Sequence, residues 1–119
     1  MQVALNILQR SLAAIDPKLK LNVRELQFSQ MIAQSAGQRF PPWMLNRFTD
    51  DADPHNFAQP FLASNGNYPK NMAYKNAQLD KLINQAVAAT DVEVRDNLYR
   101  QIGNVGFNQT PLIPVYQPL

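Results

Sequence analysis

The sequence has the length and composition of one small soluble domain. It contains 119 residues, carries a net charge of +2, and is 45% hydrophobic, which is enough for a modest core but not for two ordinary domains. The absence of cysteine excludes disulfides, thiolate metal sites and thiol catalysis. The basic residues are scattered, which argues against a nucleic-acid partner, and no apolar run is long enough to span a membrane.

The first half of the chain predicts helices that alternate with strands. Apolar residues recur every three or four positions over residues 1–15, which indicates an amphipathic helix ended by Pro17. Apolar and polar residues then alternate over 19–27, the pattern of a half-buried strand. We expect a short helix capped by Ser29 and a second strand at residues 43–48.

The second half predicts three helices. Asp53 is suited to cap the first of them, because Pro54 then takes the first helical position, where no amide donor is needed. Asn76 is the predicted cap of the second helix. Thr90 and Glu93 have the capping-box spacing expected at the start of the third.

The remaining segments are a loop and a last strand. Residues 62–71 are rich in turn-forming residues, and residues 110–119 form a short apolar segment framed by prolines. The expected fold class is therefore α/β (α+β), with about three strands packed against four or five helices. Three strands are few for an independent sheet, so we expect residues 1–119 to be a single partial lobe of a larger fold.

The second half of the sequence resembles a known family. The residues that carry the resemblance, in chain order, are Asp50, Asp53-Pro54, Asn56-Phe57, Tyr74, Asn76, Asp80, Leu82-Ile83, Thr90-Asp91, Arg95, Leu98-Tyr99, Pro111, Ile113-Pro114 and Tyr116. This order and spacing resemble the peptide/nickel family of solute-binding proteins that serve ABC importers, which are large type II periplasmic binding proteins. The match extends by motif over residues 43–118.

The resemblance implies a binding protein and not an enzyme. It predicts most of a C-terminal lobe, which helps to enclose an extracytoplasmic peptide or similar polar solute by closure of two lobes. The implied location is periplasmic or extracellular, and the implied partner of the full-length protein is its ABC permease. No cofactor, no catalytic residue and no metal site is expected. The alternative is a self-associating interaction module derived from such a lobe, which binds no cargo of its own.

The resemblance also implies a set of ligand-binding residues. It places Asp50 where peptide-binding members carry the carboxylate that pairs with the ammonium group of the cargo, a charge-assisted contact. Its expected neighbours are Trp43, Phe48, and the loop residues Asn65, Gly66 and Asn67. Packing in the core or between lobes is the alternative role of Trp43.

The acidic cluster around Asp50 also has other interpretations. As an alternative to cargo binding, all three aspartates of residues 50–53 are suited to turns and helix caps. A calcium loop would need a glycine turn and a distal acid, but no glycine occurs in residues 50–57 and no acid occurs between Asp53 and Asp80. Adjacent aspartates on one turn do not suit a two-carboxylate hydrolase, and His55, the single histidine, lacks partners for a metal.

Overall fold

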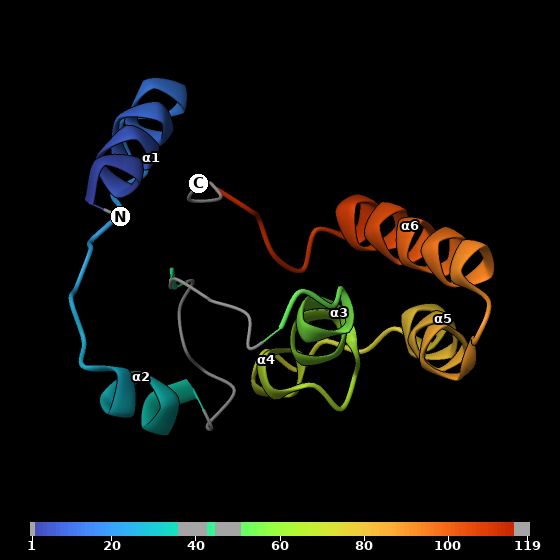
Figure 1. Cartoon of the computed structure of the whole chain (residues 1–119). Helices are drawn as coiled ribbons and strands as arrows, with labels where there is room; N and C mark the ends of the chain where they lie inside the picture. Colours follow the sequence, from blue (N-terminus) through green and yellow to red (C-terminus); the bar gives the residue numbers. More distant parts are fainter. Residues whose placement is uncertain (1, 36–42, 45–50, 116–119) are drawn as a thin grey trace.

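The computed structural model describes residues 2–35, 43–44 and 51–115, and its regular elements are all helical over these ranges (Figure 1). The helices are α1 (Gln2–Ile15), α2 (Phe28–Ser35), α3 (His55–Leu62), α4 (Asn67–Asn71), α5 (Ala77–Ala88) and α6 (Val92–Gln109). None of them is long and apolar enough to cross a membrane within the described ranges.

The buried core lies where α3, α5 and α6 meet. Helix α5 contributes Leu79, Ile83 and Ala86, which are spaced by four and three residues and so share one face. Ile102 of α6 packs against this face. Leu79 is completely shielded from solvent, so burial of this apolar stripe is the main force that holds the two helices together.

Helix α1 lies apart from this core. None of its residues is buried, and Gln9 Nε2 donates a hydrogen bond of 2.9 Å to the carbonyl oxygen of Leu21 in the segment that follows it. The Cα radius of gyration is 16.3 Å, against about 13.5 Å for a compact domain of this length. Figure 1 shows α1 standing away from the group formed by helices α3 to α6.

The predicted α/β class is wrong for the described residues. The 19–27 segment is irregular and forms no strand. Leu21 and Val23 are half-buried as the alternation predicted, but Leu19 is 46% exposed. A strand exists only if a second strand supplies its backbone hydrogen bonds, and no described segment pairs with this one. Residues 110–115 are likewise not a strand. In the strand expected at 43–48, Trp43 and Met44 have no regular structure, and the rest lies outside the described residues.

Three local predictions also need correction. Helix α2 begins at Phe28, so Ser29 lies within its first turn and does not cap it. The predicted loop contains the short helix α4, which is preceded by Gly66. Asp91, not Thr90, caps α6, because the Asp91 side chain accepts a hydrogen bond of 2.9 Å from the Val94 amide.

Candidate functional site

The 51–56 segment, which leads into α3, is shaped by its own acidic side chains. Asp53 Oδ1 accepts a hydrogen bond of 2.7 Å from the His55 amide, as a capping side chain does. The helix begins one residue later than predicted, because Pro54 and not Asp53 is the residue that directly precedes it. Asp51 Oδ1 accepts a hydrogen bond of 3.2 Å from the Asp53 amide. The Asn56 side chain also donates to Asp51. Two of the three clustered aspartates therefore satisfy the backbone of a tight turn.

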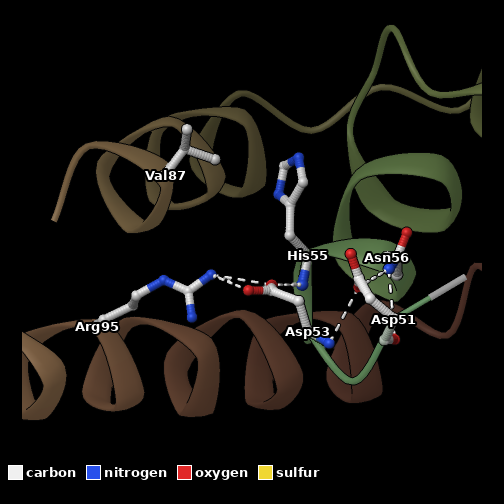
Figure 2. A pocket seen from close by; sticks show the side chains of 6 residues that line it. All are labelled: Asp51, Asp53, His55, Asn56, Val87 and Arg95. Carbon is white, nitrogen blue, oxygen red and sulfur yellow. Dashed lines mark hydrogen bonds and ion pairs between the residues drawn. The ribbon is translucent and has the colours of Figure 1, made fainter. Parts of the chain in front are cut away.

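Asp53 also forms an ion pair with a residue 42 positions further along the chain. Arg95 Nη2 lies 2.9 Å from Asp53 Oδ1 and 2.8 Å from Oδ2, and Figure 2 shows the guanidinium turned toward the carboxylate. Tyr99, one turn further along α6, accepts a hydrogen bond of 3.3 Å from the same nitrogen. The guanidinium carbon also lies 4.8 Å from the centre of the Tyr99 ring, within the range of a cation–π contact.

These contacts shift the ionisation of all three groups. The pKa of Asp53 is lowered, first by the hydrogen bond from the His55 amide and then by the bond from Arg95, because both favour the carboxylate. The hydrogen bond to Asp53 raises the pKa of Arg95. Burial raises the pKa of Tyr99, since it disfavours the phenolate. Asp53 and Arg95 therefore stay charged, and Tyr99 stays neutral, at neutral pH.

A shallow pocket of about 300 Å³ lies beside this ion pair (Figure 2). Its lining consists of Asp51, Asp53, His55, Asn56, Val87 and Arg95. The Nδ1 atom of His55 is buried there without a hydrogen-bond partner among the described residues. No group of three or more potential metal-ligating side chains occurs in the part of the chain that the structure describes. The pocket thus offers charged groups, hydrogen-bonding groups and a single imidazole.

A row of aromatic rings covers α3 and the start of α4. Phe61 stacks on Tyr68 with ring centres 4.5 Å apart, and Phe57 lies 6.4 Å from Phe61. Trp43 packs at 5.2 Å against Tyr68, with its ring tilted by 47°. Trp43 is half-buried, whereas the Phe57 side chain is 49% exposed. Rings of this kind present a flat apolar surface to a neighbouring group.

The aromatic row brings two of the predicted binding elements together. Trp43 contacts Tyr68, which directly follows Asn67 in the sequence. Trp43 and the predicted 65–67 loop are therefore neighbours. The side chains of Asn65 and Asn67 are exposed, and Asn65 Oδ1 accepts a hydrogen bond of 3.5 Å from Gln59 Nε2. Gly66 between them is buried. Asp50 and Phe48, the other predicted binding residues, lie outside the described residues.

The sequence did not single out Arg95, Tyr99 or Tyr68 as site residues. Arg95 and Tyr99 belong to the motifs on which the resemblance rests, and that was the available signal. Their contact with Asp53 could not be read from spacing, because it joins residues 42 positions apart. Tyr68 belongs to none of these motifs, and its place in the aromatic row depends on how α4 packs against α3.

Comparison with known proteins finds three relatives. The chain is 42% identical over 67 residues to heme-binding protein A of Haemophilus influenzae, which covers 56% of this chain and 12% of that protein. It is 41% identical over 85 residues to the probable deoxycholate-binding periplasmic protein YgiS of Escherichia coli, and this match covers 69% of this chain and 16% of that protein. It is 28% identical over 109 residues to the dipeptide-binding protein DppE of Bacillus subtilis, and this match covers 87% of this chain and 20% of that protein.

The chain therefore spans one fifth or less of the length of each of these relatives. No protein-family model matches the chain, and no solved structure does. All three relatives are named for the solute that they bind, and the three solutes differ.

Proposed function

Because this chain is homologous to a part of the solute-binding proteins of the peptide/nickel family, we propose that it is a cargo-binding element of an ABC importer. The observation that carries the proposal is the agreement among three relatives that are all binding proteins, although each is named for a different solute. The resemblance of the sequence, which these relatives confirm, points to the same role.

The proposed cargo is a peptide or a similar polar solute of the extracytoplasmic space. Asp50 is proposed to hold a cationic group of this cargo, since a carboxylate in a closed cleft makes strong charge-assisted hydrogen bonds. Trp43 and the 65–67 loop are proposed to lie beside it, which is supported by the contact between Trp43 and Tyr68. Phe48 is proposed as a further neighbour.

The proposed mechanism is closure of two lobes around the cargo, with this chain as part of one lobe. A ligand drives closure only by its higher affinity for the closed state, so a single lobe is expected to bind cargo weakly. The proposed location is the periplasm or the extracellular space, and the proposed partner of the complete protein is the permease of its transporter. Catalysis is not proposed.

Calorimetry of this chain tests the binding role. Dipeptides, hemin and deoxycholate are titrated separately up to millimolar concentration, and the fluorescence of Trp43, the only tryptophan, is followed in parallel. We expect measurable binding of at least one of the three. No heat and no fluorescence change with any of them would overturn the proposal.

Two substitutions of neighbouring aspartates test whether Asp50 is the anchor, that is, the residue that holds the cationic group of the cargo. Asp50→Asn is expected to weaken dipeptide binding more than threefold, because it removes the charge that pairs with the ammonium. Asp51→Asn is the matched control, since its amide oxygen can still accept the hydrogen bond from the Asp53 amide. Equal affinity of both variants, within about threefold or less than 1 kcal/mol, would show that Asp50 is not the anchor.

Self-association is a second candidate function, favoured by the exposed apolar surface of α1. Val3, Ile7 and Ile15 are 72%, 59% and 77% exposed, and helices with such faces gain free energy when a partner covers them. Light scattering over a range of protein concentrations distinguishes the two candidates. A monomer at all concentrations would rule out self-association.

A further inference from the structure

We propose that Asn65 is a deamidation site that the fold keeps from reacting, and that it reacts when the turn formed by residues 63–66 opens. Of the asparagines in the sequence, Asn65 alone is followed by glycine. Asparagine is a thermolabile residue, and a following glycine leaves it most open to attack, because glycine has no Cβ atom to obstruct the reacting groups. The reaction needs only water, and it does not depend on the proposed function.

Deamidation joins the side chain of Asn65 to the backbone of the next residue. The Gly66 amide nitrogen loses its proton to solvent hydroxide and attacks Cγ of Asn65. The new bond from nitrogen to Cγ closes a succinimide ring, and the bond from Cγ to Nδ2 breaks, so that ammonia leaves with a proton from water. Water then opens the ring. If it breaks the bond from nitrogen to Cγ, aspartate results. If it breaks the original peptide bond, isoaspartate results, and the chain then runs through Cβ and Cγ.

The fold protects the attacking nitrogen. The Gly66 amide donates a hydrogen bond of 2.7 Å to the Ala63 carbonyl oxygen, and Gly66 is buried. Hydroxide must reach this N–H group before the nitrogen can attack, so the hydrogen bond must first break, as it must for amide hydrogen exchange. Asn65 itself is exposed, and its Oδ1 atom accepts a hydrogen bond of 3.5 Å from Gln59 Nε2. The folded protein therefore protects Asn65 through its neighbour and not by covering it.

Hydrogen bonds with the start of α5 hold this turn in place. Asp80 Oδ1 accepts a hydrogen bond of 2.7 Å from the Ser64 amide, and the Ser64 hydroxyl accepts one of 3.1 Å from the Asn76 amide. Ala63, the first residue of the turn, belongs to the buried core cluster. The turn therefore opens when it separates from α5, and the rate of deamidation in the folded protein reports how often this local opening occurs.

Isoaspartate at position 65 does not fit the closed turn. It adds one carbon atom to the backbone directly before Gly66, where even an added Cβ atom would collide with the carbonyl oxygen of Gln59. The Gly66 carbonyl oxygen also accepts a hydrogen bond of 3.2 Å from the Lys70 amide in α4. A longer backbone moves Gly66 away from its partners at Ala63 and Lys70. Deamidation to isoaspartate is therefore expected to keep the turn open.

Peptide mass spectrometry measures the reaction. The full chain is incubated at about pH 9 and 37 °C, either folded in buffer or unfolded in guanidinium chloride, and is digested with trypsin at intervals. Asn56, Asn65 and Asn67 lie in one tryptic peptide, which ends at Lys70, so its fragmentation gives three rates side by side. We expect Asn65 to react fastest of the three in the unfolded chain, and at least tenfold more slowly in the folded chain. Equal rates at Asn65 in the two conditions would refute the proposal.

Asp80→Ala tests whether α5 holds the turn closed. The change removes the acceptor of the Ser64 amide, and it is expected to make deamidation of Asn65 in the folded chain at least threefold faster. Ser64→Ala, a milder change that removes the acceptor of the Asn76 amide, is expected to act in the same direction. Asp96→Ala is the matched control, since Asp96 is an exposed carboxylate of α6. Deamidation as slow in the first two variants as in this control would contradict the assigned role of α5.

Refolding of aged chains tests the effect of isoaspartate. The wild type is aged in guanidinium chloride until Asn65 has reacted, and its melting temperature is measured after dilution into buffer. Asn65→Gln, aged in the same way, controls for the treatment, and freshly prepared Asn65→Asp controls for the added charge on a backbone of normal length. We expect a lower melting temperature for the aged wild type than for either control. If all three melt at the same temperature, isoaspartate does not disturb the turn.

Discussion

At the scale of single residues, several residues that match the family pattern are structural. Asn76 caps α5 by accepting hydrogen bonds from the Gln78 and Leu79 amides. Asp80 Oδ1 accepts a hydrogen bond of 2.7 Å from the Ser64 amide, and the Ser64 hydroxyl accepts one of 3.1 Å from the Asn76 amide. These hydrogen bonds join the loop after α3 to the start of α5. Matching residues therefore identify the fold of this region more directly than they identify a binding site.

Asp53 gives a prediction for the pH dependence of stability. Its pKa in the folded protein is below the usual value of 3.8, so the unfolded chain takes up a proton more readily than the folded protein does. The stabilising contribution of the Asp53 charge is therefore present above about pH 4 and is lost as the pH falls through the lowered pKa. We expect the difference in melting temperature between the wild type and Asp53→Asn to shrink from pH 7 to pH 2.

The control for this titration is Asp96→Asn, since Asp96 is an exposed carboxylate of α6. Thermal melts followed by circular dichroism at each pH measure both variants. A difference between the wild type and Asp53→Asn that stays constant over the whole range would contradict the assignment of this stability to the Asp53 charge.

At the scale of secondary-structure elements, Gly66 determines how α4 follows α3. Its amide donates a hydrogen bond of 2.7 Å to the Ala63 carbonyl. A Cβ atom added to Gly66 would lie 2.3 Å from the Gln59 carbonyl oxygen and 2.9 Å from those of Ala63 and Pro60. The chain therefore approaches the end of α3 more closely than any side chain permits. Gly66 was predicted as a cargo-loop residue, which stays a prediction, whereas its buried position gives it a structural role.

Gly66→Ala is expected to destabilise the protein by about 1–3 kcal/mol, because the three neighbouring atoms are backbone oxygens that cannot move aside independently. The matched control is Gly103→Ala, where the added Cβ meets nothing within 4 Å. That change is expected to stabilise α6 by about 0.5–1 kcal/mol, since alanine favours a helix interior over glycine. Urea unfolding of both variants measures the two effects, and effects of the same sign would contradict this account.

At the scale of the whole molecule, two parts can be distinguished. The packed unit contains helices α3 to α6, and the N-terminal part contains α1 and the 19–27 segment. Helices α3, α5 and α6 share the core cluster, and Tyr68 of α4 stacks on Phe61 of α3. Helix α1 has no buried residue and is followed by the irregular 19–27 segment. Local opening costs little free energy where few apolar contacts are lost. The N-terminal part is therefore expected to open independently of the packed unit.

Limited proteolysis with trypsin tests this difference. Cleavage after Lys20 and Arg24 is expected to precede cleavage after Arg100, although all three side chains are exposed. The reason is that cleavage at Arg100 requires α6 to unfold from the core. Mass spectrometry of the early products measures the order. Equally fast cleavage at the three sites would contradict the division.

The sequence predicted best those features that depend on neighbouring residues. The ends of α1 and the cap of α5 were both predicted, because helical hydrogen bonds and caps join residues within a few positions of one another. The three strands were predicted by the same kind of local pattern and were not found in the described residues. A strand depends on a partner elsewhere, and alternation in one segment says nothing about whether that partner is present.

The sequence by itself determined helices α3, α5 and α6 and the kinship with solute-binding proteins, since both rest on residue types at fixed spacing. Only the tertiary structure decided that residues 19–27 form no strand, that Arg95 reaches Asp53, and that Trp43 lies against Tyr68. Each of these outcomes depends on contacts between distant parts of the chain. Such contacts form only when packing of the core brings those parts together, and no local pattern encodes them.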